Sequence, residues 1–293
     1  MTGKTAVTVI VPFYGDELPR LQRLLASLAR QDYPGPVELI VVDNNERPGV
    51  PAGVVNGRVL HEPEPGSYVA RNAALKVAGG DVVAFTDSDC VCTPGWLSRG
   101  VAMLMADPAI GAVGGGVLPL TADPAGPSLT ERYDAFFHMR QAFYVSTMGF
   151  AATANCLTRR DVLDRVGHFD TRWRSGGDRV WCGKVIEAGY RLAYCAEAAV
   201  LHDARRLDGL VLKSRRLAGQ EWSRARTSGG GLRAALRSDF RIYGKRVRRL
   251  LDPAEAAPLA DRLAFGGISL LLQAVRVAEL VRIRTTGGHP ERR

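Results

Sequence analysis

The stretch from Asp81 to Asp89 constrains the fold of this chain more than any other feature. It follows the turn pair Gly79-Gly80, continues as the apolar run Val82-Val83-Ala84-Phe85 and ends in two carboxylates, Asp87 and Asp89. A short apolar run bounded by glycines predicts a buried strand of a parallel sheet. Ligands of open α/β sheets bind at the carboxyl ends of the strands, so both carboxylates lie where a binding site is expected.

The spacing of the two carboxylates predicts a metal site. Side chains at positions i and i+2 of a strand point to the same side. Asp87 and Asp89 therefore repel each other unless a cation lies between them, and their hard oxygen ligands suit Mg²⁺ or Mn²⁺. Such a metal commonly takes its other ligands from a diphosphate. A solvated turn is the alternative interpretation of this pair when it is taken alone.

The segments around this strand predict an α/β fold. Apolar runs at residues 7–11, 37–42 and 54–60 are separated by segments with helical spacing at residues 18–28 and 67–78. This βαββαβ order indicates a Rossmann-like, mostly parallel sheet flanked by helices. Asp16 is expected near the N-cap of the first helix.

Length and composition are those of a folded globular protein. The 293 residues, 46% hydrophobic and 24% charged, suffice for one large α/β domain or for a smaller domain with an appendage. The five cysteines form no Cys-x-x-Cys pair, which argues against a zinc site and a disulfide framework. Residues 1–8 carry no signal-peptide pattern, and no uncharged apolar run reaches about 18 residues. We therefore expect a cytoplasmic protein without a membrane-spanning helix.

The chain becomes basic after Asp203. Residues 204–251 contain fourteen Lys or Arg against three acidic residues, and residues 268–283 predict an amphipathic helix. This combination favours peripheral contact of residues 204–284 with the inner face of a membrane or with a lipid phosphate. A helical cap or a homodimer surface is the alternative use of the segment. It contains no nucleic-acid-binding motif, so nucleic acid is not an expected partner.

Several stretches, in order, resemble family 2 glycosyltransferases. They are Thr8–Tyr14, Leu39–Asn45, Ala70–Ala74, Phe85–Cys90 with Pro94–Leu97, and Gly167–Asp170 with Gly177-Asp178 and Glu187–Arg191. The resemblance covers about residues 6–220. It implies a GT-A fold, in which residues 1–203 form the glycosyltransferase domain: residues 1–118 as the nucleotide-sugar half and 119–203 as the acceptor half. Residues 204–293 would be a helical C-terminal extension.

The resemblance also implies roles for individual residues. Those expected to contact the nucleotide sugar are Pro12, Tyr14, Asp43, Arg71, Asp87, Ser88 and Asp89. Asp43 would accept a hydrogen bond from a uracil-type base, unless it is a turn aspartate. Asp89 would bind the metal directly, Asp87 would support it, and His202 would close the metal site or be a satisfied histidine at a strand end. Asn155, Trp173 and Gly177 would shape the acceptor pocket, although Trp173 equally suits a packing role.

Asp178 is the candidate general base. A carboxylate near the acceptor hydroxyl can take its proton as that oxygen attacks the anomeric carbon. The alternative is an ordinary N-cap of the helix predicted at residues 180–188. The family often has an acidic residue directly before this aspartate, where this chain has Gly177, and that leaves the acceptor contacts open.

The function expected from these features is an inverting, metal-dependent glycosyltransferase that uses a nucleoside-diphosphate sugar, with UDP-sugars favoured. Gln220-Glu221-Trp222 lacks the arginine of the Gln-x-x-Arg-Trp signature of processive members. We therefore expect transfer of a single sugar, in polysaccharide or natural-product glycosylation. The alternatives are a sugar-phosphate nucleotidyltransferase, whose glycine-rich basic loop is missing after the first strand, and a non-catalytic phosphate- or membrane-binding protein.

Overall fold

The computed structural model describes residues 4–15, 18–173, 175–253, 255 and 257–286. The chain divides into two compact units, the first made of residues 1–118 and 139–203 and the second of residues 119–138 and 204–293. The compact units divide after Asp203, and residues 119–138 group with the C-terminal helices. The division of residues 1–203 into a nucleotide-sugar half and an acceptor half stays a prediction. The expected N-cap residue Asp16 lies outside the described residues.

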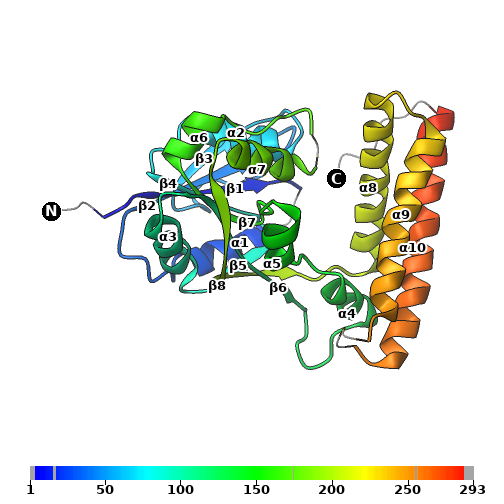
Figure 1. Ribbon diagram of the computed structural model, residues 1–293. Helices are drawn as coiled ribbons and strands as arrows, with labels where there is room; N and C mark the ends of the chain where they lie inside the picture. Colours follow the sequence, from blue (N-terminus) through cyan, green and yellow to red (C-terminus); the bar gives the residue numbers. More distant parts are fainter. Residues whose placement is uncertain (1–3, 16–17, 174, 254, 256, 287–293) are drawn as a thin grey trace. The chain divides into compact units, whose positions relative to one another are not determined.

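An eight-stranded sheet forms the centre of the first unit, in the order β3-β2-β1-β4-β7-β6-β8-β5 (Figure 1). The strands are β1 (Val7–Phe13), β2 (Val37–Asp43), β3 (Arg58–His61), β4 (Val82–Thr86), β5 (Cys90–Cys92), β6 (Ile110–Leu120), β7 (Asn155–Arg159) and β8 (Arg191–Asp203). Strands β3, β2, β1 and β4 are parallel, whereas β7 is antiparallel to β4 and to β6, and β5 is antiparallel to β8. The predicted α/β class is confirmed, with the parallel part confined to the four N-terminal strands.

Helices cover both faces of this sheet (Figure 1). They are α1 (Leu18–Leu28), α2 (Ser67–Leu75), α3 (Trp96–Ala106), α5 (Gln141–Phe143), α6 (Arg160–Val166) and α7 (Gly177–Glu187), with one π-helical turn, η1 (Tyr144–Met148). Alternate strand residues point to opposite faces. Val9 and Ala84 belong to the core that contains α1 and α3, and Ile10 and Phe85 to the core that contains α2, α6 and α7. Because both faces of β4 are buried, its sequence is apolar without interruption.

Strand pairing brings distant residues to one edge of the sheet. Phe13 pairs with Asp43 in the β1–β2 register, and Ile10 pairs with Phe85 between β1 and β4. The loops after β1, β2 and β4 therefore leave at the same edge. The antiparallel pair β5–β8 sets Cys90 opposite His202, close to the end of β4.

The second unit contains three long helices, α8 (Leu207–Thr227), α9 (Leu232–Leu251) and α10 (Leu259–Thr286). The short helix α4 (Leu129–Phe136) also belongs to this unit. The three long helices pack pairwise against one another. At one end of this bundle Tyr133 of α4 packs with Leu210, Leu250 and Phe265. A second core contains small residues of α8 and α9 together with Leu280.

Helix α10 turns polar side chains toward the bundle. Gln273, Arg276 and Glu279 are buried, and the first two bind Asp239 of α9. The sequence predicted one polar face on this helix, and the structure places three of its members inside. An 18-residue stretch of α10 has a mean hydropathy of 1.5, with 39% of it buried, so the helix is long and apolar enough to cross a membrane. This corrects the expectation that no segment qualifies, which counted only uncharged runs.

Candidate functional site

Asp87, Asp89 and His202 form a cluster of candidate metal ligands. One ligand atom of each residue lies within 4.8 Å of those of the other two. Asp87 and Asp89 follow β4, and His202 reaches them from β8 because the β5–β8 register sets it opposite Cys90. The two carboxylate side chains are 34% and 26% exposed, whereas His202 is buried. The cluster therefore opens to solvent through its carboxylates.

The orientation of His202 suits a cation. Its Nδ1 lies 3.1 Å from the carbonyl oxygen of Asp203, and its Nε2 lies 3.6 Å from Asp89 Oδ1. The imidazole therefore reaches the carboxylate pair, and neutral imidazole is a common metal ligand. Two carboxylates and an imidazole are a ligand set for a divalent metal.

Arg71 connects this cluster to the rest of the site. Its Nη2 donates a hydrogen bond to Asp87 Oδ1 at 2.5 Å, and the guanidinium carbon lies 5.7 Å from the ring centroid of Tyr68. The Arg71 side chain is almost fully buried, and a buried charge requires a partner of opposite sign. Within the described part of the chain, Arg71 Nε has no hydrogen-bond partner. One donor of this guanidinium therefore remains for an anion.

Asp178 lies in the first turn of α7, at the other end of the same polar chain. The Asp178 backbone N–H donates to the Tyr68 hydroxyl at 3.2 Å. Burial raises the pKa of the Asp178 carboxyl, an effect that the nearby Arg71 and Tyr68 oppose. The N-cap of α7 is Gly176, with a left-handed φ of 75°, so Asp178 is not the capping residue of this helix. Asp87, Arg71, Tyr68 and Asp178 are thus linked by successive contacts from the end of β4 through α2 to α7.

Gly177 is required by the packing of Tyr68. A Cβ atom at Gly177 would lie 2.8 Å from a carbon of the Tyr68 ring, closer than side chains approach one another. This explains in physical terms why the position before Asp178 is a glycine in this chain. Any side chain there would displace Tyr68, and with it the contacts to Arg71 and to α7.

Asp43, at the end of β2, is hydrogen-bonded to the loop that follows it. Its Oδ2 accepts hydrogen bonds from the backbone N–H groups of Gly49 and Val50, at 2.5 and 2.8 Å. Its Oδ1 accepts from the side chain of Asn45 at 2.7 Å. The side chain is buried, and these bonds hold the loop that follows β2. Contact of Asp43 with a nucleotide base stays a prediction.

Asn155, predicted to contact the acceptor, lies in the interior instead. It is fully buried, and its Nδ2 donates to the carbonyl groups of Gly116 and Ala198, both at 2.8 Å. Its Oδ1 accepts from Trp96 Nε1 at 2.8 Å. These bonds occupy both amide protons and tie β7 to β6 and β8. The predicted acceptor contact therefore finds no support, because the amide group is already committed to the sheet.

The remaining predicted residues differ in exposure. Tyr14 is exposed in the loop after β1, while Pro12 and Ser88 are half-buried. Trp173 is half-buried in the loop before α7. Their contacts with substrate stay predictions. No sequence motif marks Tyr68, although its position three residues before Arg71 places both on one face of α2.

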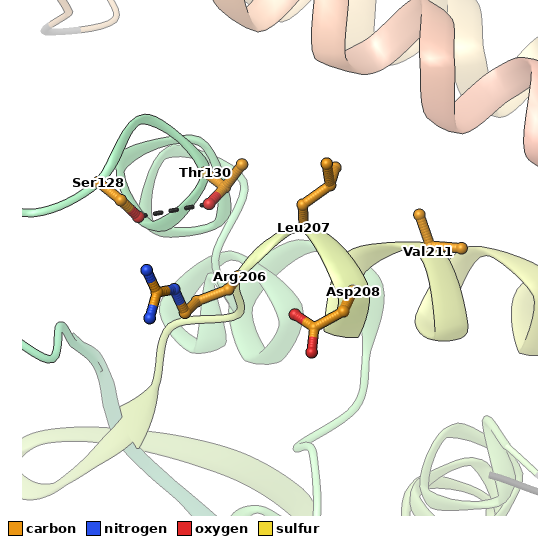
Figure 2. A pocket seen from close by; sticks show the side chains of 6 residues that line it. All are labelled: Ser128, Thr130, Arg206, Leu207, Asp208 and Val211. Carbon is orange, nitrogen blue, oxygen red and sulfur yellow. Dashed lines mark hydrogen bonds between the residues drawn. The ribbon is translucent and has the colours of Figure 1, made fainter.

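A separate hollow lies in the second unit. It has a volume of about 630 Å³ and is lined by Ser128, Thr130, Arg206, Leu207, Asp208 and Val211 (Figure 2). Asp208 is the single carboxylate in this lining. The paired carboxylates, the candidate base and the buried arginine all lie in the first unit, and we assign the chemistry to that site.

Comparison with known proteins agrees with this assignment. The family model described as glycosyl transferase family 2 matches residues 8–167. A glycosyltransferase named AglE from Haloferax volcanii is 34% identical over 220 residues, which are 72% of this chain and 71% of that protein. A pre-mycofactocin glycosyltransferase from Mycobacterium tuberculosis is 32% identical over 212 residues, which are 68% of this chain but only 43% of that protein.

Solved structures show the same fold. The mannosyltransferase PcManGT from Pyrobaculum calidifontis, in complex with GDP-Man and Mn²⁺, superposes with a TM-score of 0.59 over 96% of this chain and 87% of its own, at 23% identity. TarS from S. aureus superposes with a TM-score of 0.51 over 72% of this chain and 38% of its own, at 21% identity. The predicted GT-A fold is confirmed.

Proposed function

Because this chain belongs to glycosyl transferase family 2, we propose that it moves one sugar from a nucleoside-diphosphate sugar to an acceptor hydroxyl, with inversion at the anomeric carbon. The observation that carries the proposal is the arrangement of Asp87, Asp89 and His202 at one end of a polar chain that ends in Asp178. A donor site and a proton acceptor on one edge of a sheet are what such a transfer requires.

The metal-ligand cluster fits Mn²⁺ or Mg²⁺. Asp89 and Asp87 would offer carboxylate oxygens, and an imidazole ligand from His202 would favour Mn²⁺, because Mg²⁺ prefers oxygen ligands. When bound, the metal would neutralise charge on the departing nucleoside diphosphate. Arg71 would hold Asp87 in place and offer its remaining donor to the same diphosphate.

Asp178 would act as the general base. Its carboxylate would take the proton of the acceptor hydroxyl while the acceptor oxygen forms a bond to the anomeric carbon and the bond to the diphosphate oxygen breaks. Attack from the face opposite the leaving group inverts the anomeric centre. Burial raises the pKa of Asp178 and thereby makes it a stronger base than an exposed aspartate. Tyr68 supports this position through the backbone of Asp178.

The donor base and the acceptor are the finer parts of this proposal. We propose a UDP-sugar as donor, with Asp43, Tyr14, Pro12 and Ser88 near the nucleotide. The GDP-Man held by the Pyrobaculum protein makes a guanosine donor the rival, although a likeness at 23% identity shows the fold alone. We propose a cytoplasmic location and an acceptor presented as a free hydroxyl on a glycan, a lipid-linked sugar or a small molecule.

Thermal unfolding of the full chain with a panel of nucleotides and metals tests this proposal. UDP with Mn²⁺ should raise the midpoint more than either alone, and Asp89→Ala should remove that gain without lowering the midpoint of the free protein. Asp161→Asn serves as the control, because Asp161 is an exposed carboxylate on α6 that pairs with Arg159.

The other outcomes of the panel are informative. A larger shift with GDP than with UDP would indicate a guanosine-diphosphate sugar as donor, and the proposed sugar transfer would stand. A shift with nucleoside triphosphates but not with diphosphates would favour a nucleotidyltransferase. The proposal fails if no nucleotide shifts the midpoint in the presence of either metal.

A further inference from the structure

The outer side of α10 is apolar along nearly its whole length. The residues of its exposed stripe recur every three or four positions and are Leu259, Ala260, Leu263, Gly267, Leu270, Leu271, Ala274, Ala278 and Val281. Leu263 and Leu270 are 71% and 62% exposed, values typical of charged surface residues. Neither an acidic nor a basic residue interrupts this stripe between Leu259 and Val281. The stripe is a continuous apolar surface on the second unit.

The inner side of the same helix buries polar residues beside the apolar Phe265, Leu272, Leu280 and Ile283. Arg276 and Gln273 bind the fully buried Asp239 of α9, and the buried Glu279 pairs with Arg282. A helix that packs in water buries its apolar side and exposes its charged side. Helix α10 buries charged residues together with apolar ones and exposes no charged side chain between Leu259 and Val281, although burial of an ion pair costs desolvation free energy. This polarity suits a helix whose outer surroundings are apolar.

The neighbouring helix α9 exposes a stripe of positive charge. Its exposed side chains are Arg233, Arg237, Phe240, Arg241, Lys245, Arg248 and Leu251. Among the described residues, none of these five cations has an ion-pair partner, and neither α9 nor α10 exposes an acidic side chain. Because α9 and α10 pack against each other, the cationic stripe and the apolar stripe lie on adjoining helices.

We propose that the apolar stripe of α10 and the cationic stripe of α9 dock this protein on the surface of an anionic lipid bilayer, with α10 lying in the plane of the membrane. Apolar side chains enter the acyl boundary, while lysine and arginine contact lipid phosphates. This inference rests on the second unit alone and does not depend on the proposed sugar-transfer chemistry.

An interfacial position fits the bundle better than a transmembrane one. Helix α10 passes a length and composition test for crossing a membrane. However, α9 packs along it with five exposed cations, and each would be costly in the hydrocarbon core. At the interface those cations meet phosphates instead. Aromatic and long apolar side chains among them, Phe240 and Leu251, suit the same depth.

Charge also favours lipid over a second copy of the chain. Self-association through this surface would bring one set of five exposed cations toward an identical set, with no exposed acid on either α9 or α10 to offset them. Anionic phospholipid supplies a partner for each stripe: phosphate charge for the cations of α9 and acyl chains for the apolar side chains of α10. The occupant predicted by the surface is therefore an anionic membrane.

Flotation of the full-length protein with vesicles tests the proposal. Vesicles of phosphatidylcholine with about one third phosphatidylglycerol should bind it, and binding should weaken as salt rises and screens the cations. The double variant Leu263→Gln/Leu270→Gln should lower the partition coefficient about a hundredfold, because two buried leucines are lost. The matched control is Val77→Gln/Met105→Gln, which changes two exposed apolar residues of the first unit and should leave binding unchanged.

A second pair of variants separates the electrostatic contribution. Arg237→Gln/Arg241→Gln should reduce binding to anionic vesicles about thirtyfold and flatten its salt dependence, since each cation near the surface contributes on the order of 1 kcal/mol. Its control, Arg30→Gln/Lys76→Gln, removes two exposed cations from the first unit. All of these variants should keep the wild-type unfolding midpoint, because the altered side chains are exposed.

Four outcomes would overturn the proposal. The protein fails to float with anionic vesicles, or it floats equally well after both stripe variants. Resistance to extraction by alkaline carbonate would instead show that α10 crosses the bilayer. A dimer in light scattering that Leu263→Gln/Leu270→Gln dissociates, without lipid binding, would assign the surface to a second copy of the chain.

Discussion

Each unit contains a cluster of polar side chains built around aspartates. The two clusters differ in how fully their carboxylates are buried and hydrogen-bonded. In the second unit Asp239 is fully buried and is bound by Gln273 and Arg276. In the first unit Asp87 and Asp89 are about a third and a quarter exposed, and His202 Nε2 lies 3.6 Å from Asp89 Oδ1.

The difference teaches how to separate a stabilising cluster from a binding one. A carboxylate whose oxygens are already occupied by donors and a cation stabilises the fold and offers little to a ligand. Two partly exposed carboxylates close to each other remain open to a cation. We therefore expect changes in the second-unit cluster to appear in stability, and changes in the first-unit cluster to appear in activity.

The largest expected effect is that of Asp178→Asn. Loss of the general base should lower kcat about 10²- to 10⁴-fold with little change in donor KM. Wild-type activity should fall as pH drops through the raised pKa of this carboxyl, because the base works only when ionised. Initial rates measured across a pH series check both points, and a variant that keeps the wild-type rate would remove Asp178 from the mechanism.

The stability of Asp178→Asn tests whether the pKa of Asp178 is raised in the folded protein. A carboxyl whose pKa is raised in the folded state holds its proton more tightly there, so ionising it above that pKa costs stability. Asp178→Asn should therefore raise the unfolding midpoint at neutral pH. The gain should disappear below the ordinary pKa of an aspartate, where both states are protonated. A midpoint lowered at neutral pH would contradict the shift.

In the second unit, loss of the buried carboxylate of Asp239 should lower stability. Asp239→Ala leaves the buried guanidinium of Arg276 without its carboxylate, and we expect a loss of about 3–5 kcal/mol in the stability of the helical unit. Hydrogen exchange of α9 and α10 measures this loss locally. The paired change Asp239→Leu/Arg276→Met removes both charges and should recover most of it. Equal loss in both variants would show that packing, not charge, governs the site.

A smaller effect is expected at His202. His202→Asn should weaken activation by Mn²⁺ about tenfold to a hundredfold and Mg²⁺ activation less, because Mn²⁺ accepts nitrogen ligands more readily. Metal titrations of activity measure the difference. His61→Asn is the matched control, since His61 is an exposed histidine at the end of β3. Equal losses with the two metals would indicate that His202 only orients Asp89.

The smallest effect should come from Gly177→Ala. The added methyl group meets the Tyr68 ring and should cost about 1–3 kcal/mol of stability, with a moderate loss of kcat as Asp178 shifts. Gly183→Ala, two turns later in α7, has open space around the new Cβ and should be neutral or slightly stabilising. Urea unfolding of both variants measures the two changes in stability. Equal stabilities of Gly177→Ala and Gly183→Ala would contradict the predicted clash with Tyr68.

Local patterns were enough to predict the strands and the carboxylate pair. The run Val82–Phe85 is apolar because both faces of β4 are buried, and that condition is visible in the sequence itself. The ends of α8 and α9 also follow local signals, since the glycines after Thr227 interrupt the helical pattern and α9 begins at Leu232. Residues 129–144 do not form one helix, because α4 ends at Phe136 and the chain passes from one unit to the other at residue 138.

By itself, the sequence determined the α/β class, the family and the edge of the sheet where Asp87 and Asp89 lie, because each depends on neighbours along the chain. The tertiary structure alone decided that His202 reaches Asp89, that Tyr68 supports Asp178 and that Asn155 is committed to the interior. These three depend on strand register and on packing between distant segments. It also decided which side of α10 faces inward. Periodicity marks the two sides of a helix, but the buried partner, here Asp239, selects which one is enclosed.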